Sequence, residues 1–350
     1  MSKIVQTNNL RIVRTRPLLT PALLTEEIPA TEKAMELVNR SRSIVESILD
    51  GIDKRMLAIV GPCSVHDPAA AIDYAKKLKP VADQLSDSLF IMMRVYFEKP
   101  RTVMGWKGLI NDPDMNGSYR INEGLRKARQ LLADISEIGL SAGTEFLDTT
   151  FGQFYTDLIS WGAIGARTVE SQIHRELASG LSMPVGFKNR TDGNIQVAVD
   201  SIVAARNRHL FPSLTSEGAP AILETTGNNY GHLVLRGGSE TGTNYDSTSI
   251  KKARQLLKQS ELPEVIMVDC SHGNSLKDPV NQHKVVDSII DMRSEGDLSV
   301  CALMLESNLV AGNQKLNNNP LKYGQSVTDA CLDFDDTVDL LQKLAGSLSD

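Results

Sequence analysis

Eight short apolar runs alternate with stretches of helical periodicity from residue 56 onward, and this alternation constrains the fold more than any other feature. The runs occupy residues 56–60, 89–93, 141–144, 161–166, 183–187, 232–235, 265–268 and 300–305. Continuous apolar runs separated by helical segments indicate parallel strands that are buried on both faces. Eight such units favour an α/β fold of the closed (β/α)8 TIM-barrel type over an open sheet.

The N-terminal 50 residues do not share this repeat. A helical pattern runs from Thr31 to Asp50, where Thr31 can cap the helix and Gly51 can end it. The apolar positions near one face of this helix are Met35, Val38, Val45 and Leu49. We therefore expect an N-terminal arm and helix over residues 1–50, suited to subunit contact, regulation or closure of the barrel floor, and a catalytic barrel over residues 51–350.

Two further segments depart from the repeat. Residues 209–226 contain two short apolar stretches around Glu217 and Gly218, which predicts a β-hairpin inserted between units five and six. Residues 97–119 are rich in Gly, Pro and Asn and have no clear period. Long loops of this kind are usually functional or mobile.

Charge and cysteine content limit the class of protein. Lys plus Arg is 37 and Asp plus Glu is 43, which gives a formal net charge of −6. This balance argues against nucleic acid or an anionic membrane surface as a partner. No apolar run reaches the ~18 residues of a membrane span, and the N-terminus lacks the apolar core of a signal peptide. Four cysteines without a CxxC pair predict a reduced, cytoplasmic chain.

Every predicted strand ends on a polar or reactive side chain. The residues at or just after the eight ends are Cys63, Arg94, Glu145, Arg167, Lys188, Arg236, His272 and Glu306. In a (β/α)8 barrel all strand ends meet at the C-terminal face, where active sites lie. One such residue alone is more often a cap or an ion-pair partner, but the whole set predicts a functional site.

Five cations in this set predict an anionic substrate. They are Arg94, Lys99, Arg167, Lys188 and Arg236. Like charges at close range repel unless anions neutralise them, and guanidinium groups bind phosphate and carboxylate in a bidentate manner. Barrel acids account for one or two of the five cations but not for the set. Gly237 and Gly238 would let the backbone approach a phosphate.

A second group of residues suits a divalent metal. Cys63, His272 and Glu306 come from three neighbouring strands of a closed barrel, and Asp329 follows the last strand. Thiolate, imidazole and carboxylate ligands together are neither all soft nor all hard. No local spacing supports the set, and a lone barrel cysteine is often only a small buried hydrophobe.

Long motifs in this order resemble the short-chain type I 3-deoxy-D-arabino-heptulosonate 7-phosphate (DAHP) synthases. The motifs are GPCSVHDP at 61–68, RVYFEKPRT at 94–102, GWKGLINDP at 105–113, WGAIGART at 161–168, ESQIHRELASG at 170–180, PVGFKN at 184–189 and DCSHGNS at 269–275. The resemblance implies condensation of phosphoenolpyruvate with erythrose 4-phosphate and water to DAHP and phosphate, the first step of the shikimate pathway. It also implies a barrel with an N-terminal extension and an added hairpin.

The resemblance assigns roles to individual residues. It implies phosphoenolpyruvate binding by the five cations and one divalent ion (Mn, Fe, Co or Zn) on Cys63, His272, Glu306 and Asp329. The loop that would hold erythrose 4-phosphate is Lys99, Pro100, Arg101 and Thr102. We expect catalytic roles for Lys99, Glu145 and His272. The chain departs from the family pattern at three places: relatives more often have Thr-Val in place of Val103-Met104, a second Thr in place of Val169, and usually Gly in place of Arg190.

Members of this family are usually feedback-inhibited by one aromatic amino acid. The matching positions are Asp148, Gly152, Gln153, Leu181, Ser182, Phe211 and Ser213. Relatives that sense phenylalanine or tyrosine tend to have Pro in place of Gly152, so tryptophan is the favoured effector and the other two are alternatives. A homodimer or homotetramer is expected. Two further alternatives are a synthase that uses arabinose 5-phosphate and a barrel that senses amino acids without catalysis.

Overall fold

Eight parallel strands close into a barrel in the order β1-β10-β9-β8-β5-β4-β3-β2. The computed structural model describes residues 7–316 and 320–348. The barrel strands are β1 (Met56–Gly61), β2 (Leu89–Arg94), β3 (Ala142–Glu145), β4 (Trp161–Ile164), β5 (Val185–Lys188), β8 (Gly231–Leu235), β9 (Ile266–Asp269) and β10 (Val300–Glu306). Each predicted run is a barrel strand, so the predicted TIM-barrel fold is confirmed.

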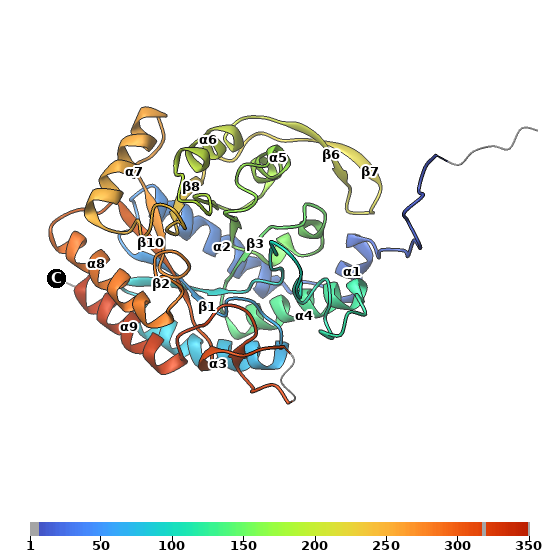
Figure 1. Cartoon of the computed structure of the whole chain (residues 1–350), viewed down its shortest axis with the longest axis horizontal. Coiled ribbons are helices and arrows are strands. Elements are labelled where there is room, and N and C mark those ends of the chain that lie inside the picture. The colour runs from blue at the N-terminus through green and yellow to red at the C-terminus, as the bar shows by residue number, and fades with distance from the viewer. Residues whose placement is uncertain (1–6, 317–319, 349–350) are drawn as a thin grey trace, which may run out of the picture.

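Helices surround the barrel and return the chain from one strand to the next (Figure 1). They are α3 (Pro68–Gln84), α4 (Ile121–Ile138), α5 (Gln172–Gly180), α6 (Gln196–Ala205), α7 (Ser247–Gln259), α8 (Gln282–Ser294) and α9 (Phe334–Ser347). The start of α3 shows the local cause: the Asp67 carboxylate accepts the N–H of Ala69 at 2.9 Å, and Pro68 occupies the first turn.

Unit three has no α-helix after its strand. Two 3-10 turns, η1 (Phe151–Phe154) and η2 (Thr156–Leu158), take that place. Contacts of one buried arginine fill the gap: Arg129 on α4 forms a bidentate pair with the partly exposed Asp157, at 2.7 and 2.8 Å, and also donates to the carbonyl of Ile28. The N-terminal segment therefore packs where an outer helix would otherwise lie.

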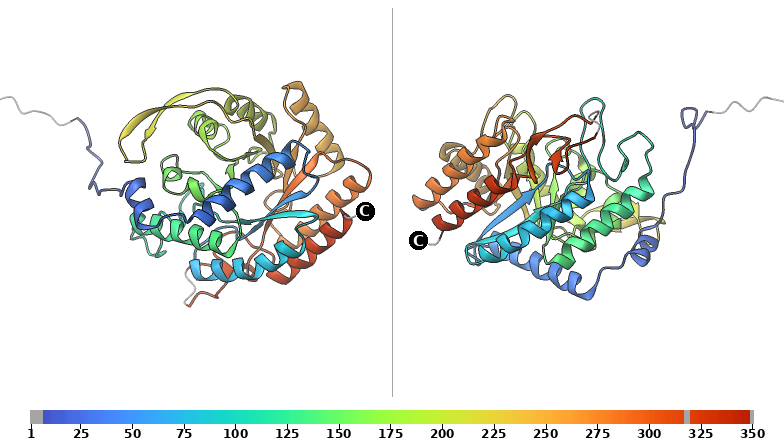
Figure 2. Two further views of the ribbon diagram at one scale, coloured as in Figure 1. Left: turned by 180° about the vertical axis from the view of Figure 1, so that it is seen from behind. Right: turned by 90° about the horizontal axis from the view of Figure 1, so that it is seen from below.

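The helix α2 (Glu32–Leu49) closes the N-terminal end of the barrel, as the view from behind shows (Figure 2). Thr31 caps it, as predicted, by accepting the N–H of Ala34. Val45 and Leu49 are buried and belong to the same hydrophobic cluster as the inward side chains of the strands. The prediction for Met35 is wrong: its side chain is 51% exposed, because Ala34 takes the buried position of that turn.

Before α2 lies an arm with one short helix that the sequence analysis did not predict, α1 (Pro21–Glu27). Thr20 caps this helix and Pro21 begins it, a signal that was present in the sequence. Residues 7–15 extend away from the body of the molecule (Figure 1), and the Val13 side chain is fully exposed. The division of the chain at residue 50 stays a prediction.

Two small sheets complete the structure. The predicted hairpin is present between units five and six as β6 (Leu210–Leu214) and β7 (Pro220–Glu224), which pair antiparallel. A second pair, β11 (Val310–Asn313) and β12 (Gln325–Ser326), follows β10 and was not predicted. Within the described residues, no helix has the length and apolarity needed to cross a membrane.

Candidate active site

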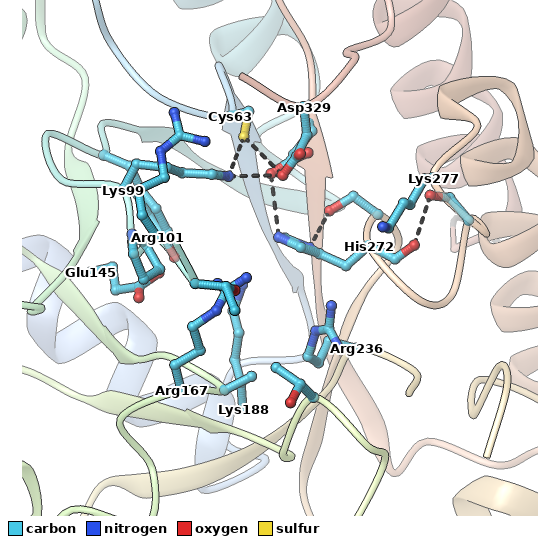
Figure 3. Close-up of a pocket in the computed structure, with 18 of the residues that line it drawn as sticks. Cys63, Lys99, Arg101, Glu145, Arg167, Lys188, Arg236, His272, Lys277 and Asp329 are labelled. Atoms are coloured by element: carbon cyan, nitrogen blue, oxygen red, sulfur yellow. Dashed lines mark hydrogen bonds and ion pairs between the residues drawn. The ribbon is translucent and has the colours of Figure 1, made fainter. Parts of the chain in front are cut away.

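A cavity of about 310 Å³ opens at the C-terminal ends of the barrel strands (Figure 3). Its lining includes every residue predicted to be catalytic, to bind substrate or to bind metal. These are Cys63, Arg94, Lys99, Pro100, Arg101, Thr102, Glu145, Arg167, Lys188, Arg236, His272, Glu306 and Asp329. None of the predicted effector residues lines it. The structure therefore separates the two predicted sets in space.

Three cations of the cavity have carboxylate partners. Arg94 pairs with Glu306 at 3.1 Å, Lys99 with Asp329 at 2.8 Å and Lys188 with Asp269 at 2.7 Å. The Arg94–Glu306 and Lys188–Asp269 pairs are almost completely buried. Acids in the structure thus neutralise more of the cations than the sequence analysis expected.

Arg167 and Arg236 are the uncompensated part of the predicted cation set. Within residues 7–316 and 320–348 neither forms an ion pair with a carboxylate. Burial lowers the pKa of Arg236, and the charge of Arg167 lowers it further against the opposing effect of Asp269. Two adjacent guanidinium groups without anions form a site that favours a dianionic group.

Asp269 lies at the centre of a buried charge network. It accepts from Lys188, and it lies 3.0 Å from Nδ1 of His272. Burial alone would raise the pKa of Asp269, but the charges of His272 and Lys188 hold it well below its usual range. The carboxylate also fixes the ring of His272, whose other nitrogen, Nε2, lies 3.7 Å from Glu306.

Cys63, Glu306 and Asp329 form a group that could hold a metal ion, because their ligand atoms lie within 4.8 Å of one another. Asp329 reaches this group from the segment after β12, which a hydrogen bond of 2.7 Å between Ser64 and Thr328 fixes to the end of β1. His272 faces the group through Nε2, as a ligand whose Nδ1 is held by a carboxylate would.

The donor group already attracts a cation. The ammonium of Lys99 lies 2.8 Å from Sγ of Cys63 and 2.8 Å from Asp329 (Figure 3). Burial and the charge of Glu306 raise the pKa of Cys63 to about 11, although Lys99 opposes this shift. A divalent ion in this group would stabilise the thiolate far more than one ammonium does. The donor set therefore fits a divalent metal.

Two positions noted in the sequence lie at the edge of the cavity. Packing requires glycine at residue 237, because a Cβ there would lie 2.5 Å from the backbone of Gly273, and the approach of a phosphate to it stays a prediction. Arg190 does not line the cavity. Its guanidinium pairs with Glu170 at 3.2 Å and with Asp192 at 3.1 Å, so it joins two loops.

Sequence reasoning missed several lining residues, of which Tyr96 has the clearest role. Its ring lies under the guanidinium of Arg94, 3.5 Å from centroid to Cζ. The period of two along an extended segment places residues 94 and 96 on the same side, and this was the available signal. Thr191, Ser271, Ser275 and Lys277 also line the cavity and gave no comparable signal.

The predicted effector residues lie outside the cavity on three neighbouring segments. Asp148, Gly152 and Gln153 belong to the loop around η1, Leu181 and Ser182 follow α5, and Phe211 and Ser213 lie on β6. His174 on α5 joins the first two segments, because its Nε2 lies 2.8 Å from the carbonyl of Leu147. Their role in effector binding stays a prediction.

Comparison with known proteins now gives the family. The model of the DAHP synthetase I family matches residues 27–342. The chain belongs to the DAHP synthetase I family. The "Phospho-2-dehydro-3-deoxyheptonate aldolase, Trp-sensitive" of Escherichia coli (strain K12) is 51% identical over 344 residues, 98% of each chain. The Phe-sensitive enzyme of the same strain is 50% identical with the same coverage.

A solved structure agrees with this assignment. The phospho-2-dehydro-3-deoxyheptonate aldolase from Francisella tularensis SCHU S4 has a TM-score of 0.95 and 49% identity, and the match covers 97% of this chain and 98% of that one. The predicted resemblance to type I DAHP synthases is therefore confirmed. Because these relatives are about 50% identical to the chain, they favour a DAHP synthase over a synthase that uses arabinose 5-phosphate.

Glu98 is expected to make the stability of this member of the DAHP synthetase I family depend on pH. The carboxylate is 4% exposed and accepts the N–H of Asp148 at 3.2 Å. Burial, with the charges of Asp148 and Glu145, raises its pKa to about 8. As the pH rises from 5 to 8 the unfolded chain loses this proton first, so the free energy of unfolding falls.

Glu98→Gln is expected to remove this decline, because the amide does not titrate. The melting temperature of the variant, relative to that of the parent protein, should rise steadily between pH 5 and pH 8 in scanning calorimetry. Glu217→Gln is the matched control at an exposed position. If the difference in melting temperature between Glu98→Gln and the parent protein is the same at every pH from 5 to 8, the raised pKa of Glu98 is contradicted.

Proposed function

We propose that the protein is a feedback-regulated DAHP synthase, which condenses phosphoenolpyruvate with D-erythrose 4-phosphate and water to DAHP and inorganic phosphate. The observation that carries the proposal is the pair of unneutralised guanidinium groups, Arg167 and Arg236, beside a buried donor group of Cys63, Glu306 and Asp329. Family membership supports the same reaction.

Phosphoenolpyruvate would bind at the arginine side of the cavity. Arg167 and Arg236 suit its phosphate, because both present charges without an internal acid partner. Lys188 and Arg94 lie at the ends of the barrel strands β5 and β2, and their charges suit the carboxylate of phosphoenolpyruvate. Fixing both ends turns C3 of the substrate toward the second substrate and removes much of the entropic cost of the encounter.

Erythrose 4-phosphate would bind nearer the donor group, with the loop of Pro100, Arg101 and Thr102 on its phosphate. Cys63, His272, Glu306 and Asp329 would hold one divalent ion, either Mn, Fe, Co or Zn. When bound, such an ion supplies Lewis-acid polarisation of a carbonyl oxygen. The ammonium of Lys99 lies beside this group and adds a positive charge next to the reacting carbonyl.

Carbon–carbon bond formation and water addition complete the reaction. C3 of phosphoenolpyruvate attacks the aldehyde carbon, water adds to C2, and phosphate leaves with cleavage of the C–O bond. Lys99 and Glu145 are the candidates for handling the water and its protons, since both line the cavity and the ammonium of Lys99 lies at the donor group (Figure 3). His272, held by Asp269, is the candidate for proton transfer at the new hydroxyl.

We propose tryptophan as the effector and a homo-oligomer as the assembly. The choice of tryptophan rests on Gly152, where relatives that sense phenylalanine or tyrosine tend to have Pro; a Cβ there would contact the ring of Phe146 at 3.4 Å. The overall identities to the Trp-sensitive and Phe-sensitive relatives are nearly equal, so this local feature carries the choice. Exposed apolar side chains on the arm, such as Val13, support association of copies.

Steady-state kinetics tests both parts of this proposal. Purified protein with Mn²⁺ is expected to form DAHP from the two substrates, and tryptophan is expected to inhibit at concentrations at which phenylalanine and tyrosine do not. Each amino acid is added alone and the initial rate is measured. Absence of DAHP formation with every divalent ion tested would overturn the activity, and selective inhibition by phenylalanine or tyrosine would overturn the choice of effector.

A further inference from the structure

The turn after β9 contains unusual backbone strain. His272, Leu276 and Lys277 all have positive φ angles, of 57°, 53° and 66°. Non-glycine residues in this region are uncommon, and their cost is tolerated where it places a functional group. His272 already has a place in the candidate site. Leu276 and Lys277 lie further along the same turn and have no role so far.

Hydrogen bonds hold this turn in its strained form. The N–H of Lys277 donates to the carbonyl of His272 at 3.0 Å, and the hydroxyl of Ser275 donates to the same carbonyl at 3.3 Å. Asn281 donates to the carbonyl of Ser275 at 3.0 Å. Burial of Leu276 does not offset the free-energy cost of the strained backbone, because its side chain is 69% exposed. The conformation instead fixes Lys277 relative to His272.

Lys277 brings a free cation to the cavity. It lines the cavity, and within the part of the chain that the structure describes its side chain has no hydrogen bond and no acid partner. Arg101 is also without a carboxylate partner there, and its Nε donates only to the carbonyl of Trp106. Figure 3 shows Lys277 beside His272, on the opposite side of the Cys63 and Asp329 group from Lys99 and Arg101.

The cavity thus has uncompensated cations in more than one place, which suits two phosphorylated substrates. Arg167 and Arg236 are coupled to each other. Arg101 and Lys277 lie on opposite sides of the donor group (Figure 3). A phosphate dianion is stabilised best when charged donors reach it from more than one side. With Arg101 alone, the second phosphate would have one guanidinium on an exposed loop.

We propose that Lys277 is a second cationic contact for the phosphate of the four-carbon aldose phosphate, across the cavity from Arg101. This inference rests on the proposed function and adds a specificity-determining residue to it. The strained turn ties the phosphate contact to His272, so that binding of the phosphate also fixes the imidazole that faces the carbonyl.

Kinetics of Lys277→Gln tests the inference. KM for erythrose 4-phosphate is expected to rise roughly tenfold or more, as for loss of a charge-assisted hydrogen bond, while KM for phosphoenolpyruvate changes by less than about twofold. Lys277→Arg is expected to retain most of the affinity. Lys284→Gln, on the exposed face of α8, is the matched control. Calorimetry of each variant checks that folding is preserved.

A substrate without its phosphate separates binding from structure. With free erythrose at high concentration the parent protein and Lys277→Gln are expected to react at equal rates. Free erythrose has no phosphate, so Lys277 has nothing to bind in the parent protein and its loss has no effect. An unchanged KM for erythrose 4-phosphate, or a rise in KM for phosphoenolpyruvate instead, would overturn the inference. Failure of the parent protein to form DAHP at all would overturn the proposed function, which distinguishes the two.

Discussion

Cys63→Ala is expected to lower kcat more than hundredfold and to release the divalent ion. Loss of partners that only orient a metal ligand costs 10–100-fold in affinity or activity, so loss of a ligand itself should cost more. The side chain is 1% exposed, and its sulfur lies among Glu306, Asp329 and the ammonium of Lys99. Metal content by mass spectrometry and the initial rate with added Mn²⁺ are the two measurements.

Another buried cysteine provides the control for this experiment. Cys301 on β10 is 9% exposed, and its thiol contacts the carbonyl of Ile266 rather than the cavity. Cys301→Ala removes the same volume from the same barrel and should retain metal and rate. Full activity and full metal content in Cys63→Ala would show that the thiol is only a packing group.

Lys188→Met is expected to remove activity and also to destabilise the fold. The Lys188–Asp269 pair is buried, with 4% and 0% exposure of the two side chains. Removal of one partner of a buried ion pair typically costs about 3–5 kcal/mol, because the remaining charge is unpaired. His272 and Ser271 still contact Asp269, so we expect the lower end of that range. Urea denaturation measures the loss.

A second substitution separates stability from binding. In the double variant Lys188→Met with Asp269→Asn the buried charge is gone, so the free energy of unfolding should recover, whereas binding of phosphoenolpyruvate, measured by titration calorimetry without the aldose, should not. Lys79→Met is the surface control: its pair with Asp83 is a helical i,i+4 contact, worth about 0.5 kcal/mol or less. If the double variant regains this binding, Lys188 acts through the fold rather than through phosphoenolpyruvate.

The barrel and its site were predictable because both follow from local patterns. Buried parallel strands must be apolar throughout, and a barrel brings the residues that follow them to one face. The partners of these residues were not predictable. Arg94 on β2 pairs with Glu306 on β10, with β1 between them, and only the direction of each side chain in the closed barrel decides this contact.

Weak local signals explain the other misses. The helix α1 is a single two-turn element, and its cap at Thr20 stands in a segment without periodicity. The pair β11 and β12 is short and has no apolar run. The strain at Lys277 depends on positive φ angles at residues that are not glycine, and residue type does not predict these angles there.

The absence of an outer α-helix between β3 and β4 has a consequence for how the activity of such a protein can be regulated. The loop that takes the place of this helix begins directly after Glu145. Arg129 holds the loop through Asp157 and links it to the N-terminal segment through the carbonyl of Ile28. Because this loop follows Glu145 directly in the chain, a change in its shape would reach the catalytic face over a few peptide units. A ligand bound at the loop would then alter activity without a separate sensory domain.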